Sequence, residues 1–416
     1  MTDQTAPPRF HLVAPRLYPC VRERERVSCG DRRCVVGHRR GCVHRTQTMS
    51  PSEGQAPVVV PVSFRSPGTK FHRLGSRYDL DRATLAALLV GEPAYRVEQV
   101  WQGLHVSLAA PEEMTTLPKA LRSKLAELPE MRSALQPVDE QSSDGAKTVK
   151  WVFHLEGGHR IETVLMHYTD RTTVCVSTQA GCAMACGFCA TGQAGFSRHL
   201  STGEIVEQVV RARRRAEASG RRLSNVVFMG MGEPLANFDP VWAAVERIHG
   251  DLGLSARHLT VSTVGIVPGI ERLTAAALPV NLAVSLHAAN DTLRDELVPI
   301  NRTYPLAALY DACQRYVSTT HRRLSIEWAM IDGINDRFSD AVELAEFAGA
   351  LGAHVNLIPL NPTPGWSTVG SPLAHVHRFR DELELRRVNA TVRRNRGTDI
   401  DAACGQLAAR SASSNT

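Results

Sequence analysis

The sequence predicts an α/β fold, an incomplete barrel of six β/α units that follows a small helical domain. Its 416 residues are 43% hydrophobic, so the chain can bury a large core. After Lys147, short β-branched apolar runs alternate with longer helical patterns, which is typical of a parallel sheet. An open doubly wound sheet produces the same alternation, so both arrangements stay open at this point.

Six strands and six helices make up the alternating region, which we expect to span residues 151–395. The predicted strands are 172–177, 225–229, 259–263, 280–286, 324–330 and 355–360. The predicted helices are 202–218, 239–250, 269–277, 305–318, 338–351 and 373–387. Six strands exceed a lone βαβ unit and fall short of the eight in a complete barrel.

Three other regions surround this core. Residues 1–68 mix Arg and Cys with Pro, Ser and Gly without any period, which predicts a disordered basic extension, and Met49 is a candidate alternative start. Residues 69–150 carry helical patterns near 81–89 and 117–125, which predict a small helical accessory domain. Residues 396–416 are expected to form a carboxyl-terminal loop and tail.

The positive charge is concentrated at the front of the chain. The net charge is +6, and residues 1–48 alone hold ten Arg against four acidic residues, so the remainder is neutral overall. A nucleic-acid site on the remainder would therefore need local basic patches. The candidates are Arg211, Arg213, Arg214, Arg215, Arg221, Arg222, Arg393, Arg394 and Arg396.

No membrane span is predicted, because no run of about 18 apolar residues is present, and no secretory signal is predicted, because the amino terminus has no apolar h-region. We therefore expect a cytoplasmic protein. Ten cysteines are a low density for a disulfide scaffold, and three of them crowd into eight residues, so metal or redox chemistry explains them better. A zinc site at Cys34, His38, Cys42 and His44 is an alternative whose spacing matches no familiar finger.

The strongest local signal is the stretch that contains Cys182, Cys186 and Cys189, directly after the first predicted strand. Iron–sulfur clusters usually take four cysteines, so a set of three leaves one iron open for a small chelating ligand. Zinc completed by a distant residue and buried structural cysteines are the alternatives. A zinc site would usually show a second close pair, and the glycines of this stretch favour a loop around a cluster.

Polar residues recur where the predicted parallel strands end. The turn after the second strand carries Gly232 and Glu233, and Glu233 offers a carboxylate for a cationic amine. Later strands end near Ser262, the run Ser285–Leu286–His287, and Asn361. Each alone is more often a turn residue, but their recurrence at corresponding ends predicts one shared ligand site.

Two further cysteines lie outside this stretch. Cys175 is on the first predicted strand, and Cys404 lies in a loop rich in Gly and Asp near the carboxyl terminus. An unassigned cysteine is usually a small buried hydrophobe. The polar neighbours of Cys404 suit a mobile thiol better, whereas Cys313, inside a helical pattern, is expected in the core.

The CxxxCxxC spacing, with an aromatic residue before its last cysteine, resembles the radical S-adenosylmethionine (SAM) superfamily. Further stretches narrow the resemblance to the RlmN and Cfr family of RNA adenine methyltransferases, across roughly residues 75–407. These stretches are Cys175–Cys182, Met229–Leu235, Val284–His287, Asn356–Pro362 and Gly397–Gln406.

The resemblance implies a role for each of these residues. It implies a [4Fe-4S] cluster on the three clustered cysteines and two SAM molecules per turnover. It implies that Gly232, Glu233, Ser262, Ser285, Leu286, His287 and Asn361 bind SAM. It further implies that Cys404 accepts a methyl group, that Cys175 resolves an RNA adduct, and that Glu162 acts as general base.

The resemblance also implies the partners and the reaction, which is methylation at carbon 2 of an adenine in 23S ribosomal RNA and of an adenine in transfer RNA. We expect an external electron donor such as flavodoxin. We also expect a monomeric protein whose helical domain contacts RNA. Three alternatives remain: Cfr-type methylation at carbon 8, a non-catalytic iron–sulfur RNA-binding factor, and an enzyme that generates a glycyl radical.

Overall fold

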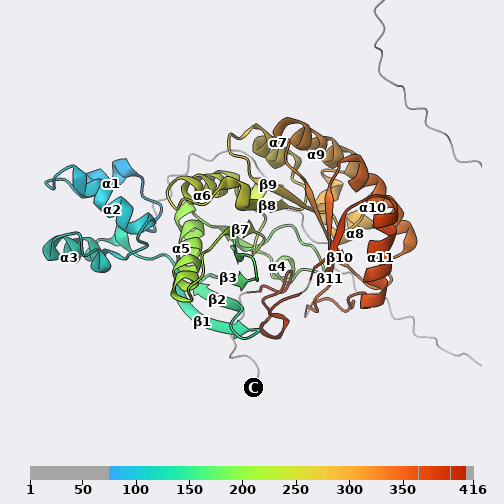
Figure 1. Cartoon of the computed structure of the whole chain (residues 1–416), viewed down its shortest axis with the longest axis horizontal. Helices are drawn as coiled ribbons and strands as arrows, with labels where there is room; N and C mark the ends of the chain where they lie inside the picture. The colour runs from blue at the N-terminus through green and yellow to red at the C-terminus, as the bar shows by residue number, and fades with distance from the viewer. Residues whose placement is uncertain (1–74, 364, 394, 409–416) are drawn as a thin grey trace, which may run out of the picture. The chain divides into compact units, whose positions relative to one another are not determined.

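A ten-stranded sheet organises the protein (Figure 1). The computed structural model describes residues 75–363, 365–393 and 395–408. The predicted extension 1–68, the alternative zinc ligands within it, and Arg394 lie outside the described residues. Among the described residues, no helix combines the length and apolar character that crossing a membrane requires.

Six neighbouring strands of the sheet are parallel, and they coincide with the six predicted strands. They are β4 (Thr172–Cys175), β7 (Asn225–Phe228), β8 (Leu259–Thr263), β9 (Asn281–Ser285), β10 (Ser325–Met330) and β11 (His354–Pro359). They lie side by side in sequence order, and β12 (Ala390–Val392) adds a last parallel strand beside β11. A doubly wound sheet reverses its strand order at a switch point, and no such reversal occurs here.

The predicted helices of the alternating region are also confirmed, and Figure 1 shows them around the outside of the strands. They are α5 (Thr202–Ala218), α6 (Phe238–Gly250), α7 (Val267–Ala275), α9 (Leu306–Thr320), α10 (Phe338–Ala350) and α11 (Leu373–Leu385). Ser201 and Glu204 form a capping box that begins α5. The short helix α8 (Asp291–Leu297) was not predicted, because two turns carry too little periodicity.

An antiparallel meander extends the sheet before β4, and it moves the expected domain boundary. It consists of β1 (Gln136–Ser143), β2 (Thr148–His154) and β3 (Arg160–His167), with β3 paired to β4. The expected boundary between residues 150 and 151 falls inside β2, so the helical region ends earlier. These strands were not predicted from the sequence. Strand β1 is polar and largely exposed, whereas β2 is buried on both faces and therefore lacks the alternation of apolar and polar residues that marks a half-buried strand.

Three helices precede the meander: α1 (Arg82–Leu88), α2 (Tyr95–His105) and α3 (Lys119–Glu127). The first and third match the predicted patterns, whereas α2 was not predicted. The Asp79 carboxylate accepts hydrogen bonds from Ser201 Oγ at 2.9 Å and from Gly203 N at 2.6 Å. This carboxylate therefore ties the segment before α1 to the start of α5.

Several arginines expected to form a basic patch on α5 are instead engaged with carboxylates. Arg214 forms an ion pair with Glu113, which follows α2, and Arg215 pairs with Glu140 of β1. The other two pairs lie within α5, between Arg211 and Glu207 and between Arg213 and Glu217. These arginines help to join neighbouring elements, which reduces the positive charge available to RNA on this helix.

Candidate active site

A cavity of about 220 Å³ opens where the parallel strands end, and most of the predicted site residues line it. The lining includes the cysteine stretch, the turn after β7, the ends of β8 and β9, and the carboxyl-terminal segment. The predicted residues on its wall are Cys175, Cys182, Cys186, Cys189, Gly232, Glu233, Ser262, Ser285, His287, Asn361 and Cys404. Convergence at the carboxyl ends of parallel strands is the arrangement that such folds use for ligands.

The loop that carries the three clustered cysteines is shaped by close backbone approaches. It lies between β5 (Gln179–Gly181) and the short helix α4 (Ala190–Gln193), and β5 pairs with β6 (Phe196–His199). A Cβ on Gly181 would lie 1.9 Å from the carbonyl oxygen of Gly195, and a Cβ on Gly187 would lie 2.1 Å from the Trp366 ring. Both positions therefore require glycine.

The donor set of this loop fits an iron–sulfur cluster. The three cysteine side chains share one cavity wall, and thiolate sulfur is the ligand that such clusters take. Burial raises the pKa of Cys182 to about 12 and that of Cys186 well above its ordinary value, with smaller contributions from the neighbouring thiols. Ionised, these thiolates would repel one another without a cation between them, and the irons of a cluster supply that positive charge.

Glu233 presents a buried carboxylate to the cavity. Its side chain accepts hydrogen bonds from the backbone N–H of Leu235 at 3.0 Å and of Val264 at 2.9 Å. Burial raises its pKa to about 7, although these hydrogen bonds lower it. Gly232 has φ +100°, and a Cβ there would lie 2.5 Å from Gln179, so glycine is needed for this turn. A carboxylate held in this way is suited to receive an ammonium group.

His287 lines the cavity as a neutral ring. Its Nδ1 accepts a hydrogen bond from the backbone N–H of Ala329 at 3.0 Å, which places the proton on Nε2. Burial lowers its pKa to about 3. The ring meets Phe188 edge to face, with centroids 4.7 Å apart, and Phe188 lies between the second and third clustered cysteines. His287 therefore connects the end of β9 to the cysteine loop.

Two predicted residues do not line the cavity. Leu286 is fully buried, and its backbone N–H donates to the carbonyl oxygen of Glu327, so its side chain serves the core. Glu162 is only 2% exposed, on β3, with Lys150 Nζ 3.8 Å from its carboxylate. Alternation along a strand places Glu162 on the same face as Val164, which does line the cavity.

The two separate cysteines both line the cavity although they are far apart in the sequence. Cys175 ends β4, and Cys404 follows the single turn η6 (Thr398–Ile400). Cys404 is exposed, but the protein around its sulfur raises its pKa to about 11, while Arg393 lowers it. Burial raises the pKa of Cys175 to about 12, and the Cys404 sulfur raises it further. Both residues line the same cavity.

The segment around Cys404 is attached directly to the cysteine loop. The N–H of Ala190 donates to the carbonyl oxygen of Gly405 at 2.8 Å, and Thr191 Oγ1 donates to that of Leu407 at 2.6 Å. Asn361 Nδ2 donates to the carbonyl oxygen of Cys404 at 3.1 Å. Hydrogen bonds to three backbone carbonyls thus hold this segment, and Cys404 lines the cavity.

An ion pair that the sequence analysis missed also lines the cavity. Glu327, on β10, accepts a hydrogen bond from Asn356 Nδ2 at 2.8 Å and lies 3.6 Å from Arg393. Burial raises the pKa of Glu327, and Arg393 opposes this shift. Arg393, a candidate for a local basic patch, lines the cavity together with Cys175 and Cys404. An acidic residue inside the apolar run 326–331 was the signal that could have revealed Glu327.

Comparison with known proteins gives consistent matches. Residues 176–348 match the family model described as the radical SAM superfamily. A probable dual-specificity RNA methyltransferase RlmN from Chloroflexus aurantiacus is 50% identical over 349 residues, which cover 80% of this chain and 92% of the relative. The protein of the same name from Frankia casuarinae is 52% identical over 340 residues, covering 78% of this chain and 80% of the relative.

A solved structure agrees with these relatives. The crystal structure of a radical SAM methyltransferase from Sphaerobacter thermophilus is 48% identical to this chain, with a TM-score of 0.78. The match covers 81% of this chain and all of the other one.

Proposed function

This chain belongs to the RlmN family of radical SAM RNA methyltransferases, and we propose that it methylates carbon 2 of adenine in RNA. The proposed targets are adenine 2503 of 23S ribosomal RNA and adenine 37 of transfer RNA. The observation that carries the proposal is that one cavity contains the three clustered cysteines together with Cys175 and Cys404. Neither a structural iron–sulfur site nor a glycyl-radical activating enzyme needs the last two thiols.

The cofactors are assigned to residues of the cavity wall. Cys182, Cys186 and Cys189 would hold a [4Fe-4S] cluster, and Gly232 with Glu233 would receive the amino group of SAM. Ser262, Ser285, His287 and Asn361 would contact the rest of SAM, and Leu286 would contribute through its backbone. When bound, the cluster and two SAM molecules per turnover supply one reductive cleavage and one methyl group.

The chain's own residues would perform the remaining steps. Cys404 Sγ takes the methyl group as a thiolate and presents it to the adenine. The methyl carbon would lose one hydrogen atom to the adenosyl radical that the bound cofactors supply and would then bond to the adenine ring carbon. The adduct would return its extra electron to the cluster. Glu162 removes the proton from the ring carbon. Cys175 Sγ then attacks Cys404 Sγ, so a disulfide forms as the methylated base is released. The presence of Cys175 and Cys404 on the wall of one cavity supports this pairing.

The substrate must bring its base into the cavity, so we propose unfolded or protein-free RNA whose adenine has left its stack. We propose that helices α1–α3 form the accessory region that contacts RNA. The strands β4 and β7–β11, with the helices that follow them, would form the six units of an incomplete barrel. A flavodoxin-type donor and a monomeric enzyme complete the proposal. Because the substrates are ribosomal and transfer RNA, the cytoplasm is the proposed compartment.

The test is methylation of protein-free 23S ribosomal RNA and transfer RNA by the reconstituted enzyme with SAM and a reductant. Digested RNA is separated by liquid chromatography and mass spectrometry under conditions that resolve 2-methyladenosine from 8-methyladenosine. We expect 2-methyladenosine in both RNAs. Accumulation of 8-methyladenosine would instead assign the Cfr-type reaction.

A further inference from the structure

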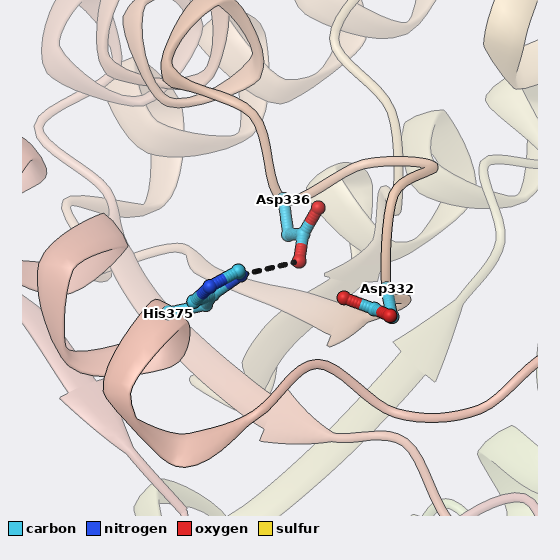
Figure 2. A group of neighbouring side chains, drawn as sticks. All are labelled: Asp332, Asp336 and His375. Carbon is cyan, nitrogen blue, oxygen red and sulfur yellow. Dashed lines mark ion pairs between the residues drawn. The ribbon is translucent and has the colours of Figure 1, made fainter.

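A cluster of three potential metal ligands lies outside the proposed catalytic cavity (Figure 2). Asp332 and Asp336 belong to the loop between β10 and α10, and His375 lies in the first turn of α11. One ligand atom from each residue can be chosen so that all three lie within 4.8 Å of one another. Figure 2 shows the side chains turned toward one another from these two elements.

Asp336 is the buried member of this cluster, and one of its oxygens lacks a hydrogen bond. Its side chain is 5% exposed. Oδ1 accepts a hydrogen bond from the N–H of Gly333 at 3.0 Å, but Oδ2 has no hydrogen-bond partner and is shielded from solvent. A buried carboxylate oxygen without a donor is costly. This oxygen points to His375, whose Nδ1 lies 3.6 Å away.

The 3.6 Å contact between His375 and Asp336 involves only one of the two carboxylates of the cluster. Among the described residues, no lysine or arginine forms an ion pair with Asp332 or Asp336. A divalent cation bound among the three side chains would supply a positive partner for both carboxylates.

We propose that Asp332, Asp336 and His375 bind a divalent transition-metal ion of the zinc class. A mixed set of imidazole and carboxylate ligands is typical of such ions, whereas Mg²⁺ and Ca²⁺ prefer oxygen alone. Ligand distances of about 2.0–2.2 Å in a tetrahedral site place ligand atoms about 3.4 Å apart. The separation of 3.6 Å between His375 and Asp336 is close to this spacing. The half-buried Asp332 carboxylate offers an oxygen within 4.8 Å of both atoms and would move inward to bind.

The site would brace one wall of the cavity. Asn335, between the two aspartates, donates to the carbonyl oxygens of His287 at 2.8 Å and of Ala329 at 2.7 Å, and both residues line the cavity. The loop is also paired with the chain before α11, because Asp332 N donates to the carbonyl oxygen of Val369 at 3.1 Å. A metal ion here would fasten the loop to α11 and thereby stabilise the position of His287.

The test measures Zn²⁺ binding by the full chain with its cysteine cluster assembled, so that those three thiols are occupied. Wild type is compared with Asp332→Asn, His375→Gln and, as a matched control, His377→Gln, which changes an exposed histidine of the same helix. The amount of bound Zn²⁺ per chain is measured after equilibrium dialysis. We expect wild type and His377→Gln each to bind one Zn²⁺ more than either of the two ligand variants. Other cysteines and histidines are common to all four proteins, so their binding cancels in the comparison.

A second readout is thermal unfolding with and without Zn²⁺. Zn²⁺ should raise the Tm of wild type and His377→Gln, and affinity should fall at least about tenfold in each ligand variant. Unchanged cluster absorbance shows that the variants are folded. Equal Zn²⁺ uptake by all four proteins, or equal loss in His377→Gln, overturns the proposal. Neither readout involves RNA, so the result is independent of the proposed methylation.

Discussion

The cysteine loop and the Cys404 segment face the same cavity but are built differently. The loop is enclosed by the β5–β6 pairing and by two glycines that admit no Cβ. The Cys404 segment has one 3₁₀ turn, and three hydrogen bonds to its carbonyls attach it to α4 and Asn361. A cluster needs ligands in a fixed arrangement, whereas a methyl carrier must serve more than one reaction partner. The enclosed cysteine loop thus suits the proposed cluster site, and the Cys404 segment, which is attached by three hydrogen bonds, suits the proposed methyl carrier.

Removing one cluster ligand should have the largest effect. In Cys186→Ala, two thiols remain, so we expect loss of cluster absorbance and of 5′-deoxyadenosine formation. The matched control is Cys313→Ala, which removes a buried sulfur from α9 outside the cavity. Cluster absorbance and SAM cleavage should persist in this control. A fully loaded Cys186→Ala protein would contradict the assignment of the loop.

The two separate cysteines should fail in different ways, because their proposed roles are sequential. Cys404→Ala removes the methyl acceptor, so neither methylated RNA nor a crosslink should form. Cys175→Ala should still form the bond to RNA but lack the thiol that releases it, so a covalent protein–RNA species should accumulate. Denaturing gels with labelled RNA distinguish these outcomes, and cluster absorbance should stay unchanged in both variants. Methylation by Cys404→Ala would remove the methylcysteine step.

The rigidity of the cysteine loop can be tested with a pair of glycines. Gly181 and Gly195 have φ of +76° and +75°, so alanine is strained at either position, but only Gly181 lies against backbone. Gly195→Ala should cost about 1 kcal/mol, as expected for left-handed backbone alone. Gly181→Ala should cost several kcal/mol more and reduce cluster occupancy, because the backbone must move apart. Chemical denaturation measures both, and equal costs would show that the close approach is unimportant.

The smallest effect is expected from the charges beside Cys404. Arg393 lowers the pKa of this thiol and Glu327 raises it. Arg393→Met should therefore move thiol methylation to higher pH and slow it at pH 8 by about tenfold or less, because less thiolate is present. Glu327→Gln should shift the profile in the opposite direction. A pH series of Cys404 methylation, measured by protein mass spectrometry, separates these electrostatic effects from misfolding, which would slow both variants at every pH.

The sequence predicted those features that depend on local pattern. Six of the seven parallel strands described, β4 and β7–β11, follow from β-branched runs, whereas the three-residue β12 was not predicted. The structure also brings eleven of the thirteen predicted site residues to one cavity. The meander was missed because β1 is polar and its pairing with β2 depends on distant packing. The Glu327–Arg393 pair was missed because the two residues are far apart in sequence and meet only when β10 and the end of β12 are neighbours of β11.

The attachment of the Cys404 segment to α4 has a consequence for the order in which the protein is made. Cys189 precedes Cys404 by about 215 residues. At synthesis rates of about 5–20 residues per second, the cluster loop leaves the ribosome about 10–40 seconds before the residues that close its cavity wall. The Cys404 segment that contacts the cysteine loop is therefore the last part of the cavity wall to be synthesised.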